Sequence, residues 1–213
     1  MSQEKIYRSI AAAKNEKGLV EFANKLHMAE LTHFSRLMAE DSKIGIVVQD
    51  YSKGTGEYNV IVEANILPEE AQELFERAKG ISYYGCKGDF QKSWMKIFGE
   101  YADEKGEKDG NSIVHKLNIT RKAKDPNGEP MRYPWTIDIE NGKGKMREDK
   151  NALVSGTYVC LKKAQKKLSD EELIRVLRRV DSCIREFEGR CAEKLYEPAY
   201  RKLYAEQLER QFH

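Results

Sequence analysis

The sequence predicts an α+β fold made of an N-terminal helix, antiparallel β-hairpins that form a sheet, and a long C-terminal helix. Three observations predict it. Apolar residues near the N-terminus recur every three or four positions, which is typical of an amphipathic helix. Segments in the middle of the chain alternate between apolar and polar residues, as half-buried strands do. After Ser169 the chain returns to helical spacing.

The stretch GLVEFANKLHMAELTHFSRLMAED, residues 18–41, is the predicted N-terminal helix. Its apolar stripe consists of Leu19, Phe22, Ala23, Leu26, Ala29, Phe34, Leu37 and Met38. Residues 44–62 then change to a period of two on either side of SKGTGE, a segment rich in turn-forming residues. This stretch therefore predicts a β-hairpin.

Two shorter helices are predicted next. Residues 67–80 have Pro68 near the first turn and Gly80 just past the last, the usual places of these residues at helix ends. Residues 89–102 form the second helix. On one of its sides lie Phe90, Trp94, Ile97, Phe98 and Tyr101.

The charged segment DEKGEKDGN, residues 103–111, is typical of a loop because glycines interrupt it. It predicts a boundary between two subdomains. Residues 1–110 would hold the helices and the hairpin, and residues 111–213 the antiparallel sheet and the long C-terminal helix. A single domain is the alternative, because 213 residues suit either arrangement.

The second half predicts three strands and the terminal helix. The turn sequence DPNGEP separates the first two predicted strands, which are IVHKLNITRKA, residues 113–123, and YPWTIDI, residues 133–139. SGTYVCLKKA, residues 155–164, is the third predicted strand. Ser169 and Glu172 are spaced as a capping box, so the long helix is expected to begin there.

The glycines of ENGKGK, residues 140–145, raise the question of a phosphate-binding loop. Such a loop needs its glycines between a strand and the N-terminus of a helix, where free N–H groups point at the anion. The residues that follow have no apolar helical stripe. Asn141-Gly142 therefore predicts the reversing turn of a β-hairpin, or a bulged turn.

Charge is distributed unevenly along the chain. The net charge is +2, yet residues 114–168 hold 13 Lys and Arg against 6 Asp and Glu, a net charge of +7. This basic middle argues against an acidic mimic of DNA and favours a polyanion as partner.

No apolar run approaches the roughly 20 residues that cross a bilayer, and MSQEKIYRSIAAAK lacks an apolar leader. We therefore expect a cytoplasmic protein. Its four cysteines have no metal-site spacing and are expected to be reduced and structural.

Three basic clusters follow the predicted strands. They are Arg121, Lys122 and Lys124; Lys143, Lys145, Arg147 and Lys150; and Lys162, Lys163, Lys166 and Lys167. If the strands are neighbours, these side chains would form one positive surface that binds phosphates. The alternative is a solvated sheet edge on which lysines block aggregation.

The terminal helix and two aromatic pairs offer further contacts. Arg175, Arg178 and Arg179 lie opposite the apolar stripe of the helix, where neighbouring carboxylates provide an alternative, structural role. Tyr83 and Tyr84 lie between glycines and are candidates for stacking on bases. Tyr133 and Trp135 flank Pro134, and Trp135 is expected to be a core residue because it shares a face with Ile137 and Ile139.

Residues 133–188 resemble small accessory proteins. The resemblance lies in YPWTIDIENGKGK and in the following SGTYVCLKKAQKKLSDEELIRVLRRVDSCIREFE. Conjugative elements and phages of Gram-positive gut bacteria carry these proteins. Some are similar to anti-CRISPR inhibitors, which bind a Cas nuclease, its guide RNA or its DNA. The resemblance implies a binding protein and assigns no residue roles.

No motif of a hydrolase, kinase or metalloenzyme is present, so the sequence predicts neither an enzyme nor a cofactor. The first hypothesis is a non-enzymatic protein that engages nucleic acid or a nucleoprotein complex, with an anti-CRISPR inhibitor as its sharpest form. The second is a structural or partner-binding protein with no nucleic-acid role, for which dimerisation through the C-terminal helix is one arrangement. The residues proposed to pair in such a dimer are Leu177, Val180, Ile184 and Phe187. An enzyme with a site assembled in space is the third.

Overall fold

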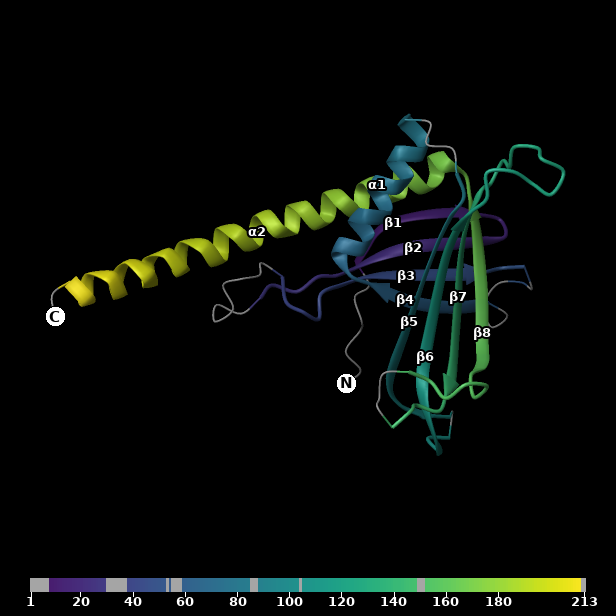
Figure 1. The fold of residues 1–213 in the computed structure, drawn as a ribbon, viewed down its shortest axis with the longest axis horizontal. Helices are drawn as coiled ribbons and strands as arrows, with labels where there is room; N and C mark the ends of the chain where they lie inside the picture. Colours follow the sequence, from purple (N-terminus) through teal and green to yellow (C-terminus); the bar gives the residue numbers. More distant parts are fainter. Residues whose placement is uncertain are drawn as a thin grey trace.

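The computed structural model describes residues 8–29, 38–52, 54, 59–84, 88–103, 105–148 and 152–211. Within them the chain forms two antiparallel four-stranded sheets, in the orders β1-β2-β3-β4 and β5-β6-β7-β8, and two helices (Figure 1). The elements are β1 Arg8–Asn15, β2 Gly18–Lys25, β3 Lys43–Asp50, β4 Val60–Ile66, α1 Pro68–Tyr84, β5 Phe90–Ala102, β6 Lys108–Arg121, β7 Trp135–Gly144, β8 Val159–Leu168 and α2 Asp170–Gln211.

The predicted fold class is wrong in its N-terminal helix and in the arrangement built on it. Gly18–Lys25 is strand β2, paired antiparallel with β1 and β3. The apolar residues of this stretch also fit a period of two, and Val20 and Phe22 are fully buried on one face of the sheet. Pairing on both sides outweighs the local helical spacing. Residues 30–37 of the predicted helix lie outside the described residues. The fold is a sheet-rich α+β fold.

The predicted helix over residues 89–102 is also wrong, because this segment is strand β5. It pairs with β6 from Phe90 opposite Arg121 to Ile97 opposite Val114. A spacing of four, as in Phe90, Trp94 and Phe98, puts side chains on one face of a helix and equally on one face of a strand. The predicted subdomain boundary falls inside β6, and β5 on its N-terminal side pairs with that strand.

The strands of the second sheet run across those of the first at a steep angle (Figure 1). β7 and β8 cross β3 and β4, and the apolar faces meet there. Ile46 from the first sheet and Trp135 and Ile137 from the second are fully buried in one core cluster, which confirms Trp135 as a core residue. The sequence also predicts the hairpin that β3 and β4 form, and this prediction is confirmed.

The predicted turn at Asn141-Gly142 is wrong. Strand β7 continues through both residues to Gly144. The irregularity lies in the partner strand, because the register against β8 shifts between Asn141, opposite Lys162, and Gly142, opposite Cys160. The loop that reverses the chain therefore comes after Gly144.

Both helices that follow a strand begin where they were predicted. Pro68 opens α1, but the helix continues past Gly80 to Tyr84. The capping box of α2 is present: Glu172 N donates to Ser169 Oγ over 3.1 Å, and Ser169 N donates to Glu172 Oε2 over 2.9 Å. The predicted start of the long C-terminal helix is thus confirmed.

The first half of α2 packs on α1 and β1, and its second half extends away from the two sheets (Figure 1). Leu177, Val180 and Ile184 are fully buried in the core of the protein itself. Phe187, the fourth residue predicted to pair in a dimer, is half-buried. A dimer through α2 would therefore have to use Phe187 or residues further along the helix. In the second half, Tyr196 and Tyr204 are exposed. Neither described helix is long and apolar enough to span a membrane.

Candidate functional site

Arg121, predicted to contact phosphate, is part of the framework of the protein. It is 8% exposed, and its Nε and Nη2 each donate to a carboxylate oxygen of Asp170 over 3.0 Å. Its Nη1 donates to Gly88 O over 2.9 Å, and Trp135 Nε1 donates to Asp170 Oδ1 over 2.6 Å. Burial favours a higher pKa for Asp170, but the hydrogen bonds from Arg121 and Trp135 outweigh burial and hold the pKa below its usual value. Arg121 joins β6 to the start of α2.

Lys143 and Lys163 are neutralised by neighbouring carboxylates. Lys163 Nζ lies 3.1 Å from Asp138 Oδ2 and 2.7 Å from Glu140 Oε1, and its hydrogen bond lowers the pKa of Glu140. Lys143 Nζ lies 2.5 Å from Asp109 Oδ2, and this hydrogen bond lowers the pKa of Asp109 to about 2. Both lysines therefore form ion pairs within the second sheet.

The remaining basic residues of the three clusters lie at opposite ends of the second sheet. Lys145, Arg147 and Lys162 are exposed where β7 ends and β8 begins. Lys122 and Lys124 are exposed at the other end, where β6 ends and β7 begins. Lys150 lies outside the described residues. The clusters do not form the single surface that the sequence suggested.

The other predicted contacts are dispersed as well. Arg175, Arg178 and Arg179 are exposed on α2. Tyr83 and Tyr84 end α1, and their side chains lie outside the described part of the structure.

One hollow does bring basic residues together. It has a volume of about 640 Å³ and lies between the β1–β2 turn, the residues just before β7 and the end of β8. We call it the basic hollow, and its lining residues are Asn15, Glu16, Lys17, Tyr133, Gln165, Lys166 and Lys167. The turn is held in place by Asn15, whose Oδ1 accepts hydrogen bonds of 3.1 Å from the N–H groups of Lys17 and Gly18. The backbone of Lys17 is thereby held within the turn.

Lys166 is the buried lysine of this hollow, with 5% of its surface exposed. Its Nζ donates to Gly18 O over 2.7 Å. An ammonium group carries three N–H donors, and Gly18 O is its one hydrogen-bond acceptor within the described part of the chain. Burial lowers the pKa of Lys166. The site therefore holds a desolvated cation with donors left for a ligand.

Replacing Lys166 with methionine is expected to leave the free energy of unfolding within about 1 kcal/mol of the wild-type value at neutral pH, because an apolar side chain of similar length removes a buried charge. A lysine with a lowered pKa disfavours folding while it is charged, and this penalty fades as the pH rises toward its ordinary pKa of 10.5. Urea unfolding at neutral and alkaline pH should therefore show the wild-type protein gaining stability relative to Lys166→Met as the pH rises. A difference independent of pH would contradict a buried, charged Lys166.

Exposed cations surround the basic hollow. Lys17 and Lys167 lie at its rim, and Tyr133 is 39% exposed with Arg132 Cζ 5.3 Å from its ring centroid. Tyr133 ends the arm, the segment 122–134 that projects beyond the sheet (Figure 1). Two backbone hydrogen bonds hold the base of this arm, from Lys122 N to Pro134 O over 2.9 Å and from Met131 N to Ala123 O over 3.0 Å.

The arm also carries the exposed side chains of Lys122, Lys124 and Arg132. Together with Lys17 and Lys167 these cations form no ion pair with a carboxylate in the described residues. Sequence reasoning identified Lys122, Lys124, Lys166 and Lys167 as basic residues and Tyr133 as a stacking candidate. It missed Lys17, which comes from a turn far away in the sequence.

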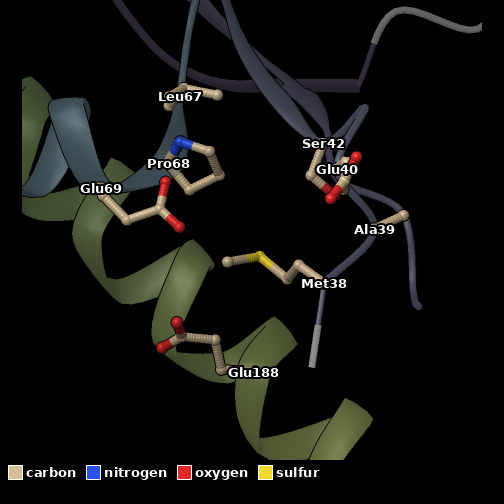
Figure 2. A pocket seen from close by; sticks show the side chains of 8 residues that line it. All are labelled: Met38, Ala39, Glu40, Ser42, Leu67, Pro68, Glu69 and Glu188. Atoms are coloured by element: carbon tan, nitrogen blue, oxygen red, sulfur yellow. The ribbon is translucent and has the colours of Figure 1, made fainter. Parts of the chain in front are cut away.

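A second hollow has the opposite charge. It has a volume of about 520 Å³ and lies beside the start of α1. Figure 2 shows Met38 reaching toward its centre, with the carboxylates of Glu69 and Glu188 on one side and Glu40 on the other. This hollow does not suit a polyanion, and its glutamates carry no further sign of a ligand.

No group of three or more His, Cys, Asp or Glu residues suited to a metal ion occurs in the parts of the chain that the structure describes. Among the described cysteines, Cys160 is exposed, Cys183 half-buried and Cys191 buried, and all three are free thiols; Cys86 lies outside the described residues.

No model of a protein family, no curated protein and no solved structure matches this chain. The resemblance of residues 133–188 to accessory proteins of mobile elements therefore stays a prediction.

Proposed function

We propose that this protein is a non-enzymatic nucleic-acid-binding protein that holds the phosphate backbone with the basic hollow and the arm beside it. The observation that supports this most is the convergence of Lys17, Lys166 and Lys167 on one hollow that also contains an exposed aromatic ring, Tyr133. The cations of the arm extend the positive surface. Nucleic acid displayed on a nucleoprotein complex, such as the Cas effector that the resemblance implies, presents the same phosphates.

Phosphate contacts release condensed counterions, so their contribution to affinity falls steeply with salt. Two contacts, one for each exposed lysine of the hollow, Lys17 and Lys167, correspond to a loss of roughly 12-fold in affinity for duplex DNA between about 50 and 200 mM salt. Exposed lysines with no paired carboxylate lose little on binding, because they exchange water and small ions for phosphate.

Fluorescence anisotropy with labelled oligonucleotides at increasing salt tests the proposal. We expect the double variant Lys17→Gln/Lys167→Gln to weaken binding and to reduce the salt slope by about 2, roughly one unit per lysine. Glu16 contributes the carboxylate of the hollow, so Glu16→Gln is expected to strengthen binding.

The matched control is Lys145→Gln/Lys162→Gln, which removes two exposed lysines from the opposite end of the same sheet. This control should leave the salt slope nearly unchanged. An equal loss of affinity in both double variants would show that charge acts without a defined site. The proposal fails if neither DNA nor RNA binds at about 50 mM salt, where phosphate contacts are strongest.

A further inference from the structure

We propose that the basic hollow takes a single unpaired nucleotide, with its base against Tyr133 and its phosphate at Lys166, so that the protein prefers single-stranded nucleic acid to duplex. This inference rests on the proposed function and specifies the form of nucleic acid that the site accepts. A volume of about 640 Å³ suits a ligand of this size, since small-molecule sites measure roughly 300–1,000 Å³.

The depth of Lys166 separates the two forms of nucleic acid. Lys17 and Lys167 lie at the rim, where the phosphates of a rigid duplex can reach them. Lys166 also lines the hollow, but it is 5% exposed and its ammonium group lies against the backbone of Gly18, so it is far more buried than the other two lysines. A phosphate on a flexible single strand can enter far enough to accept a hydrogen bond from this ammonium group. The phosphates of a duplex are fixed on a convex cylinder and stay at the rim.

Tyr133 supplies the second half of the site. Its ring is partly exposed, lines the hollow and is flanked by the Arg132 guanidinium. Pro134, which follows it, is buried, so the backbone that carries the ring is anchored to the sheet. Single-strand-binding proteins combine such an aromatic ring with a basic groove, because every base has a face that can stack. In a duplex the bases are already stacked on each other and their faces are not accessible.

The side chains around Tyr133 suit an unpaired base. Gln165 contributes an amide, which can both donate to and accept from a base edge. Lys17 and Lys167 line the same hollow as Lys166, where they can neutralise the phosphates of the flanking nucleotides. One nucleotide in the hollow and its neighbours on the rim account for each basic residue of the site.

The test compares labelled oligo(dT) and oligo(U) of about 16 nucleotides with a blunt duplex of the same length, at one salt concentration. The wild-type protein is expected to bind a single strand about tenfold more tightly than the duplex. Tyr133→Leu should lose this preference through weaker single-strand binding, with duplex binding unchanged, and Tyr133→Phe should retain it because the ring is kept. Lys166→Met should also weaken single-strand binding selectively.

Thermal unfolding of each variant identifies any that fails to fold, and if Tyr133→Leu fails, Lys166→Met provides the comparison with wild type. Equal wild-type affinity for single strand and duplex overturns the inference while the proposed function stands. The same conclusion follows if Tyr133→Leu weakens both probes by the same factor. Absence of salt-dependent binding to every probe overturns the inference and the proposed function together.

Discussion

Replacing Arg121 with methionine is expected to lower the free energy of unfolding by about 3 kcal/mol, because it removes one partner of a buried ion pair. Three hydrogen bonds are lost, two to Asp170 and one to Gly88 O. Asp170 keeps the hydrogen bond from Trp135, and its side chain is 33% exposed. These two facts place the expected loss at the lower end of the range for broken buried pairs. Urea unfolding followed by circular dichroism measures it.

The loss should depend on pH in a defined direction. The pKa of Asp170 is lowered in the folded protein, because the hydrogen bonds from Arg121 and Trp135 outweigh the opposing effect of burial. Such a carboxylate stabilises the fold above its unfolded pKa, and this contribution is lost as the pH falls through the folded pKa. The difference between wild type and Arg121→Met should therefore shrink as the pH falls below about 4.

The double variant Arg121→Met/Asp170→Asn should recover part of the loss, since no uncompensated charge remains and the asparagine Oδ1 can still accept from Trp135. Lys122→Met is the matched control: it removes the neighbouring cation, which is exposed, and should change stability by less than about 0.5 kcal/mol. A loss below about 1 kcal/mol for Arg121→Met would contradict a structural role. Arg121 would then return to the set of candidate phosphate contacts.

Arg121 also explains why the sequence predicted the binding residues only in part. Arg121, Lys122 and Lys124 are all basic residues of one short segment. Arg121 is buried in an ion pair, whereas Lys122 and Lys124 are exposed. The partner, Asp170, lies 49 positions away, at the start of α2. Lys17 was missed for the same reason, because it reaches the hollow through pairing of a turn and a strand that are distant in sequence. The sequence shows which residues are charged, but it does not show which distant residues they contact in the fold.

The fold was predicted where local chemistry decides it. The capping box at Ser169 and the proline at the start of α1 act within one turn of a helix, so sequence spacing is sufficient there. The two wrong helices were predicted over residues 18–41, of which residues 30–37 lie outside the described part, and over residues 89–102. Their apolar residues have a spacing that suits a helix and a strand alike. Long-range pairing with β1, β3 and β6 decided between the two. Pairing of this kind depends on elements that periodicity does not reveal.

Gly142 lies where the sequence predicted a turn, and replacing it is expected to have the second large effect on stability. Replacing it with alanine is expected to cost about 2–3 kcal/mol, because the new methyl group would enter a well-packed site. A Cβ at this position would meet the backbone oxygen of Val159 far inside contact distance and would lie 2.9 Å from Tyr158 Cε2. Tyr158 has little freedom to move aside. The Lys116 ammonium lies 3.3 Å from its ring centroid, and its hydroxyl is 3.3 Å from Glu140 Oε2.

Gly144, two residues further along the same strand, provides the control. A Cβ there would lie 3.4 Å from Leu153 Cδ2 and 3.4 Å from Tyr158 Cα, which the flexible leucine can accommodate. Gly144→Ala should therefore be neutral or stabilise by up to about 1 kcal/mol, because alanine loses less backbone entropy on folding. Equal effects at the two positions would contradict the close approach of β8 to Gly142.

A third variant, Gly142→Asn, separates this close approach from a hairpin turn. Asparagine tolerates the positive φ of a tight turn, so a turn at Asn141-Gly142 would accept it at little cost. Gly142 is not among the described glycines with positive φ, and the obstacle at this position is the neighbouring strand. Gly142→Asn should therefore destabilise the protein at least as much as Gly142→Ala. Dinucleotides such as Asn-Gly predict a turn through the φ that they permit, whereas here the glycine is needed because it has no side chain.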